Sequence, residues 1–276
     1  MEDVKYTFLE WNIQGFGGSC NYSIPNFVID TVIYKNADIV VLVEFYIGNN
    51  FDYVREKMKG KYHIFISPFV YGHNQVLIAL KKTRFKDEEI KEVISINPVD
   101  TALPEYLQIN IVTERDEEFS VVGTRIKTQG DKREEQFNYL KERLKLIETF
   151  VCLGDFNMFV GSVDKKFPEI DEKSGTKKKA IVAYGPRTTN KERWSFIHRD
   201  GGKAWIDAVV GKNIKVLDNQ TDALSKKKGY MMYAKYDWDF VNQENGYRDI
   251  SPDDYISLKG IPNHAILLGA FTLEDE

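Results

Sequence analysis

Cysteine is scarce in this chain of 276 residues, which has only Cys20 and Cys152. So few cysteines exclude a disulfide-rich scaffold, and Cys152 lies within an apolar run, so we expect a reducing compartment. Apolar runs such as 39–43 and 265–271 are too short to span a bilayer. The first five residues lack the basic region and apolar core of a signal peptide. These absences predict a cytoplasmic protein without membrane contact.

An excess of basic residues is also missing. The chain has 38 Lys and Arg against 42 Asp and Glu, which gives a net charge of −4. No global positive field therefore marks a nucleic-acid binder, and such an enzyme would need a local basic patch or a metal ion. The apolar content of 42% and the aromatic content of 13% are sufficient for a large core.

The most informative stretch is 150–157. Its apolar residues, Phe150–Leu153, predict a buried strand that ends at Gly154. Asp155 and Asn157 follow, and side chains two apart on an extended chain point the same way. A carboxylate and an amide presented together can hold a metal-bound water or a phosphate oxygen. The same residues also suit an ordinary turn, so the interpretation depends on what other stretches supply.

Polar side chains recur at the ends of other predicted strands. The predicted strands are 4–13, 38–44, 119–126, 238–242 and 265–273, and the polar residues at them are Asn12, Glu44, Arg125, Lys127, Asp239 and His264. A carboxylate at the end of an apolar strand is costly unless it is paired, bound to metal or at the rim of the protein. Several acids on one rim would form an oxygen-rich site suited to Mg²⁺.

Strands dominate the pattern, and helices separate them at intervals. Helices are predicted at 25–36, 51–59 and 131–148. Their order favours an α/β fold with two packed sheets and helices outside. No linker divides the chain, so we expect one domain over 1–276, with a long irregular insertion at about 161–203.

Six short motifs, in the correct order, resemble those of the endonuclease/exonuclease/phosphatase superfamily, the DNase I-like metal-dependent phosphoesterases. They are Trp11-Asn12-Ile13-Gln14-Gly15, Val40-Val41-Leu42-Val43-Glu44, Gly154-Asp155-Phe156-Asn157, Trp205-Ile206-Asp207-Ala208, Trp238-Asp239-Phe240-Val241 and Asn263-His264. The resemblance implies a four-layer α/β sandwich formed by two mixed sheets with helices on the outside. It implies hydrolysis of a phosphoester by in-line attack of water.

The resemblance also implies a role for each site residue. Glu44, supported by Asn12, would hold Mg²⁺, with Mn²⁺ as a possible substitute. Asp155 would orient or deprotonate the attacking water, and Asn157 would donate to a phosphate oxygen.

The remaining site residues would bind or stabilise the phosphate. His264, oriented and kept cationic by Asp239, would stabilise the transition state. Arg125 would clamp the phosphate with help from Lys127.

Two departures from the family pattern bear on this chemistry. Arg125 stands where the family commonly has histidine or tyrosine, and arginine stays protonated, so it does not serve easily as a proton donor. Asn263 replaces an acid before the terminal histidine, which removes one negative charge and weakens the case for a second metal. Asp207 is expected to be structural.

Three functions remain open. The first is a nuclease or phosphodiesterase acting on nucleic acid, without an obligate protein partner. The second is a phosphatase or phosphodiesterase for a small-molecule or lipid phosphoester. The third is a non-catalytic binding module, suggested by Arg125 and Asn263.

Overall fold

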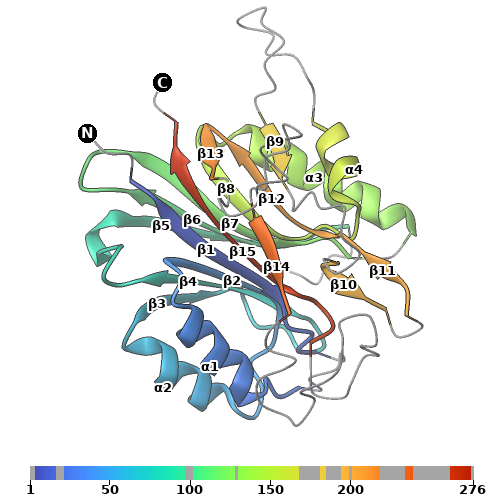
Figure 1. The fold of residues 1–276 in the computed structure, drawn as a ribbon, viewed down its shortest axis with the longest axis horizontal. Coiled ribbons are helices and arrows are strands. Elements are labelled where there is room, and N and C mark those ends of the chain that lie inside the picture. Colours follow the sequence, from blue (N-terminus) through green and yellow to red (C-terminus); the bar gives the residue numbers. More distant parts are fainter. Residues whose placement is uncertain are drawn as a thin grey trace, which may run out of the picture.

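The computed structural model shows two mixed β-sheets packed face to face, with helices on their outer faces (Figure 1). It describes residues 4–16, 22–96, 102–127, 130–167, 181–184, 194–198, 201–217, 234–238 and 262–274. For residues 130, 131 and 234–236 it describes only the backbone. The predicted four-layer α/β sandwich is confirmed.

The first sheet contains both ends of the chain. Its strands lie in the order β13-β15-β1-β2-β4-β3, with β14 also paired to β15. Their bounds are β1 Tyr6–Asn12, β2 Ile39–Phe45, β3 Tyr62–Ile66, β4 Gln75–Lys81, β13 Ile214–Val216, β14 Ala234–Asp237 and β15 Ile266–Leu273. At its centre, β1 runs parallel to β2 and antiparallel to β15. Helices α1 (Asn26–Lys35) and α2 (Phe51–Lys59) cover its outer face (Figure 1).

The second sheet has the order β5-β6-β7-β8-β12-β9. Its strands are β5 Ile90–Ser95, β6 Glu105–Val112, β7 Glu118–Arg125, β8 Phe150–Asp155, β9 Ile181–Tyr184 and β12 Asp207–Lys212, and the 3₁₀ helix Asp87–Glu89 precedes β5. Strand β8 is parallel to β7 and antiparallel to β12. Helices α3 (Gly130–Lys145) and α4 (Val160–Lys165) lie on its outer face (Figure 1).

The alternation of side chains along each strand explains the layers. On β7, Val121 belongs to the core cluster that contains residues of both sheets, whereas Val122 packs in the cluster that contains α3. On β8, Leu153 belongs to the cluster between the sheets, and Cys152 belongs to the cluster that contains α3. Because both faces of β8 are buried, Phe150–Leu153 forms a continuous apolar run in the sequence.

The described part of the region at 161–203 contains both helical and strand residues. It contains most of α4, and β9 extends the second sheet by pairing with β12. Strand β10 (Phe196–Ile197) pairs with β11 (Lys203–Ala204). Most of the predicted strand at 238–242 lies outside the described residues. Within the part of the chain that the structure describes, no helix is long and apolar enough to cross a membrane.

Gly154 lies where β7 and β8 approach most closely. A Cβ built on Gly154 would lie 1.8 Å from the carbonyl oxygen of Thr124, whereas one built on Gly161 of α4 would meet nothing within 4 Å. Only glycine therefore fits position 154, and the neighbour that requires it is the backbone of β7.

We expect Gly154→Ala to lower the free energy of unfolding by about 3 kcal/mol or more, because the strands must separate to admit the methyl group. Gly161→Ala is the matched control and should raise this free energy by up to about 1 kcal/mol, since alanine favours a helix. Urea denaturation of both variants measures the difference. Equal stabilities would show that the contact with Thr124 is not a constraint.

Candidate active site

The site lies where strand ends from both sheets meet. Asn12 ends β1 and Glu44 lies near the end of β2, while Asp155 ends β8 in the opposite sheet. Arg125 ends β7 directly opposite Asp155 in the strand register. The structure therefore brings together these four predicted residues from distant parts of the sequence.

Asn12 joins the two sheets through its side-chain amide. Its Nδ2 donates to Glu44 Oε1 at 2.9 Å and to Asp155 Oδ2 at 3.0 Å. Its Oδ1 accepts the backbone N–H of Gln14 at 3.1 Å. With Asn12 fully buried, this amide fixes the two carboxylates relative to each other.

The backbone at Glu44 is in an unusual conformation. Its φ is +50°, in the left-handed region, and the pairing of β2 with β4 shifts register between Leu42 and Phe45. A non-glycine residue in this conformation costs of order 1–3 kcal/mol, and such strain is concentrated at functional sites. The irregularity in β2 turns the Glu44 side chain toward the site.

Arg125 is held by acids from three strands. Its Nη2 lies 2.9 Å from Glu44 Oε1, its Nη1 3.0 Å from Glu105 Oε1, and its Nε 3.9 Å from Asp155 Oδ2. Burial lowers the pKa of Arg125, but these three carboxylates raise it by more, so the guanidinium stays cationic. Burial raises the pKa of Glu105, and Arg125 opposes that shift.

Asp155 is poised to exchange a proton. Burial and, to a lesser extent, the charge of Asp207 raise the pKa of Asp155 to about 7, although His264 and Arg125 act to lower it. Asn157 donates its backbone N–H to Asp155 Oδ1 at 2.8 Å. Its side-chain Nδ2 donates to Ile126 O at 2.6 Å and to Asp155 Oδ2 at 3.1 Å. Both amide hydrogens are thus engaged, so Asn157 orients Asp155 here instead of offering a donor to phosphate.

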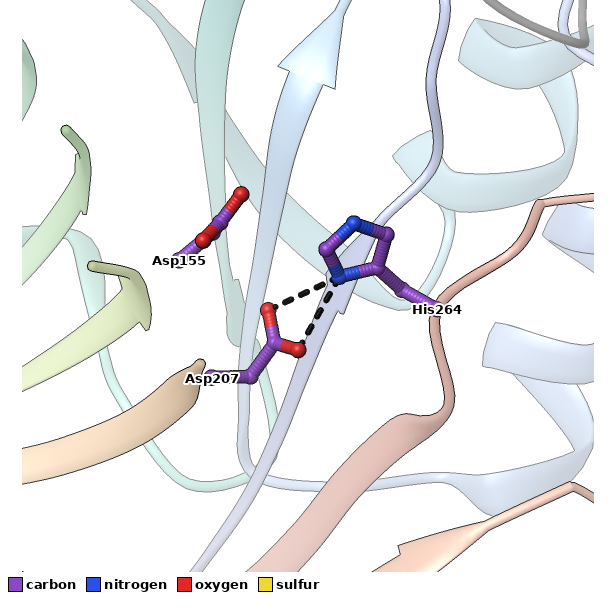
Figure 2. Close-up of side chains that lie close together, drawn as sticks. All are labelled: Asp155, Asp207 and His264. Atoms are coloured by element: carbon purple, nitrogen blue, oxygen red, sulfur yellow. Dashed lines mark hydrogen bonds and ion pairs between the residues drawn. The ribbon is translucent and has the colours of Figure 1, made fainter. Parts of the chain in front are cut away.

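His264 is paired with Asp207, as Figure 2 shows. Its Nδ1 lies 3.0 Å from Asp207 Oδ2 and 3.1 Å from Oδ1. Burial lowers the pKa of His264, but Asp207 and the other nearby carboxylates raise it by more, which favours the imidazolium. We expected Asp239 to make this contact and Asp207 to be structural. The structure places Asp207 in this contact, and Asp239 lies outside the described residues.

Ser195 positions Asp207, and the sequence analysis assigned neither residue to the site. Ser195 is fully buried, and its Oγ accepts the backbone N–H of Ile206 at 2.8 Å and of Asp207 at 3.2 Å. The ring of the next residue, Phe196, lies 4.8 Å from the imidazole of His264 between centroids. A signal was available for Asp207, because it follows the apolar Ile206 much as Asp239 follows Trp238. No sequence pattern marks Ser195.

Two sets of residues could hold a divalent cation. Glu44 and Asp155, with Asn12 between them, offer the hard oxygen atoms that such ions prefer. Asp155, Asp207 and His264 also offer one ligand atom each, all within 4.8 Å of one another (Figure 2). His264 would have to lose its proton to bind metal, and its pairing with Asp207 opposes that loss. The donor chemistry therefore fits the metal better at Glu44.

Lys127 lies beside the site. Its backbone N–H is bound by Gln136 Oε1 at 2.7 Å, and its charge lowers the pKa of Glu105.

Comparisons with known proteins agree with the fold. The sequence model of the Endonuclease/Exonuclease/phosphatase family matches residues 9–225. No curated protein matches the sequence. Truncated Caenorhabditis elegans TDP2 is similar in structure, with a TM-score of 0.63, 13% identity and coverage of 98% of this chain and 97% of that one.

Two further solved structures have the same fold. ANGEL2, a 2',3'-cyclic phosphatase, gives a TM-score of 0.64 at 13% identity, covering 99% of this chain and 96% of that one. D. rerio TDP2 complexed with a single-strand DNA product gives 0.61 at 14% identity, covering 98% of this chain and 100% of that one.

Glu10 is an additional acid that sequence analysis did not assign to the site. It is fully buried on β1, two residues before Asn12, and neither carboxyl oxygen has a hydrogen-bond partner. Burial raises the pKa of Glu10 well above its usual range, and Asp207 and Asp155 raise it further. A protonated Glu10 avoids adding another negative charge beneath the site.

We expect Glu10→Gln to be more stable than the native protein at pH 8. The unfolded carboxyl ionises near pH 4.5, whereas the folded one must stay protonated, so native stability falls by up to about 1.4 kcal/mol per pH unit above 4.5 until the folded pKa is reached. Below pH 4.5 both states bind the proton and the advantage of glutamine should vanish. Thermal unfolding across pH 4–8 tests this, and a constant difference between the two proteins would contradict it.

Proposed function

Because this chain belongs to the endonuclease/exonuclease/phosphatase family and is therefore a metal-dependent phosphoesterase, we propose that it hydrolyses a phosphodiester bond of nucleic acid. The attack is in line, by water that Asp155 activates. One observation carries the proposal: Asp155 has a pKa raised to about 7 and is held between Asn12 and Asn157. A general base is most effective when its pKa lies near the working pH.

Glu44, with Asn12 beside it, would hold the divalent cation, Mg²⁺ or in its place Mn²⁺. When bound, such an ion supplies a Lewis acid that withdraws charge from the phosphate and its leaving oxygen. Asn12 holds the carboxylates of Glu44 and Asp155 together, so the metal ligand and the base share one support. Their separation is thereby set before the substrate arrives.

Two cations of the chain complement the phosphate. The imidazolium of His264, maintained by Asp207, stabilises the negative charge that grows in the transition state. The guanidinium of Arg125 forms one ion pair with Glu44 and one with Glu105. Its remaining N–H groups can donate to a phosphate oxygen. Lys127 assists Arg125, and Asp239 remains a proposed acid of the same site.

The nucleic-acid substrate is supported by the similar solved structures. One of them, D. rerio TDP2, is complexed with a single-strand DNA product. A small-molecule phosphoester is the second candidate, since ANGEL2 is a 2',3'-cyclic phosphatase and the net charge here is −4. The buried thiol of Cys152 is free, in accord with the proposed cytoplasmic location.

The first test is turnover on a panel of phosphoesters with Mg²⁺ or Mn²⁺. The panel contains single- and double-stranded DNA, an abasic-site duplex, RNA, an inositol phosphate and bis-p-nitrophenyl phosphate. We expect metal-dependent cleavage of nucleic acid, and Asp155→Asn should lower kcat by roughly 10²–10⁴ because it removes the base.

Asp52→Asn is the control for that test, because Asp52 lies on α2 with a side chain 84% exposed. Its kcat should equal that of the native protein. Full activity of Asp155→Asn, or turnover that persists in saturating EDTA, would overturn the mechanism. Cleavage of the small esters alone would select the second candidate function.

A comparison of Asp207→Asn with Asp239→Asn identifies the partner of His264. Asp207→Asn should lower the pKa of His264, because the contact at Nδ1 raises it, and should lower kcat by roughly 10²–10⁴. Titration of the imidazole by NMR measures the pKa directly. A pKa that moves in Asp239→Asn and stays constant in Asp207→Asn would contradict the pairing in Figure 2.

A further inference from the structure

Four aromatic rings gather beside the site. Phe16 lies 4.9 Å from Tyr22 and 5.2 Å from Tyr46 between ring centroids, and Tyr46 lies 5.8 Å from Tyr22 and 5.7 Å from Phe69. We call these four residues the aromatic platform. They come from three separate stretches of the chain, so the cluster depends on the fold and does not follow from one sequence motif.

Hydrogen bonds connect the platform to Glu44. The Phe16 N–H donates to Asn74 Oδ1 at 2.9 Å, and Asn74 Nδ2 donates to Glu44 Oε2 at 3.4 Å. The backbone of Glu44 also accepts the Gly15 N–H at 2.8 Å, and Gly15 O accepts the Tyr22 N–H at 2.9 Å. Phe16 and Tyr22 are therefore connected by hydrogen bonds to the proposed metal-binding residue, and Phe69 contacts them through the ring of Tyr46.

The platform is open to solvent on one side. Tyr22 is 42% exposed and Phe69 is 49% exposed, whereas Tyr46 beneath them is only 8% exposed. Tyr71, two residues after Phe69, is 84% exposed. Three of the seven large hydrophobic side chains exposed in the described chain thus lie in or next to the platform. Exposed apolar side chains concentrated in one place mark a binding surface.

We propose that the aromatic platform binds an unpaired nucleobase next to the phosphate that is cleaved, so that the enzyme selects single-stranded nucleic acid. The inference rests on the proposed function. Aromatic side chains stack on any base, because every base has a π-face. A base within a duplex is already stacked and offers only its edges.

The composition of the platform favours a base over a lipid chain. Its exposed members are Tyr and Phe, and two of the four rings carry a polar hydroxyl. An aliphatic chain would be matched by Leu, Ile or Val side chains. The other large exposed apolar residues, Tyr34, Val93, Leu146 and Phe159, lie on α1, on β5, after α3 and before α4.

The test uses the full chain with Mg²⁺ and three substrates of equal length: a single-stranded DNA, the same strand with abasic residues in place of its nucleotides, and its duplex. The native protein should cleave the single strand with the lowest KM. Phe69→Ala should raise that KM by about 5- to 150-fold, which corresponds to the loss of one stacking contact. Phe69→Trp should restore it.

Two comparisons separate stacking from damage to the site. Phe69→Ala should leave KM and kcat on the abasic strand unchanged, and Tyr22→Ala should repeat the pattern of Phe69→Ala. Tyr34→Ala, which truncates an exposed ring on α1, should change nothing. Equal effects of Phe69→Ala on both single strands would overturn the inference, because the platform would then only support Glu44.

Failure of the inference differs from failure of the proposed function. If both single strands are cleaved with the same KM and Phe69→Ala alters neither, the platform binds no base while the nuclease activity stands. If the protein cleaves small phosphoesters and none of the three strands, the proposed substrate is wrong and the inference falls with it.

Discussion

Compensation of buried charge is the constraint on which the site depends. Glu44, Glu105, Asp155 and Asp207 approach one another between two apolar sheets, where an unpaired carboxylate would be very costly. Arg125 and His264 supply the matching positive charges, and Asn12 and Asn157 supply hydrogen-bond donors. Each acid is therefore held in place by the group that also neutralises it. Removing one member leaves its partner buried and unpaired, so structure and chemistry at this site cannot be separated.

Arg125 places a permanent positive charge in the site, and its guanidinium does not transfer a proton. A histidine or tyrosine there could exchange a proton, whereas guanidinium stays charged across the working pH range. Its charge lowers the pKa of Asp155, which keeps more of that group ionised near neutral pH. Asn263 contributes no negative charge beside His264, and its buried Oδ1 has no hydrogen-bond partner. Asn263 and Arg125 together therefore make the charge around His264 and Asp155 less negative than an acid and a neutral side chain at these two positions would.

Local pattern predicted two packed sheets and polar side chains at the ends of their strands, whereas the roles of those side chains came from the resemblance to the family. Continuous apolar runs identify strands buried on both faces, and a polar residue at the end of such a run lies at the rim of its sheet. Asn12, Glu44, Asp155 and His264 were found in this way. The partner of His264 was not, since Asp207 and Asp239 each follow an apolar residue. The pairing of β12 with β8 places Asp207 opposite Asp155, and only the fold brings it to His264. Ser195 acts through backbone N–H groups, and no residue pattern records such a contact.

The strained backbone at Glu44 links substrate recognition to the metal site. A left-handed residue in an irregular strand persists only where its surroundings fix it, and here Gly15 binds its carbonyl while Asn12 and Asn74 bind its carboxylate. Asn74 also accepts the backbone N–H of Phe16, and Gly15 accepts that of Tyr22. A base stacked on these rings is thereby placed relative to Glu44 through two short hydrogen-bonded connections. Rigid support shared by a binding surface and a catalytic group is what positions a substrate accurately. Selection of the substrate and orientation of its phosphate thus depend on the same few contacts.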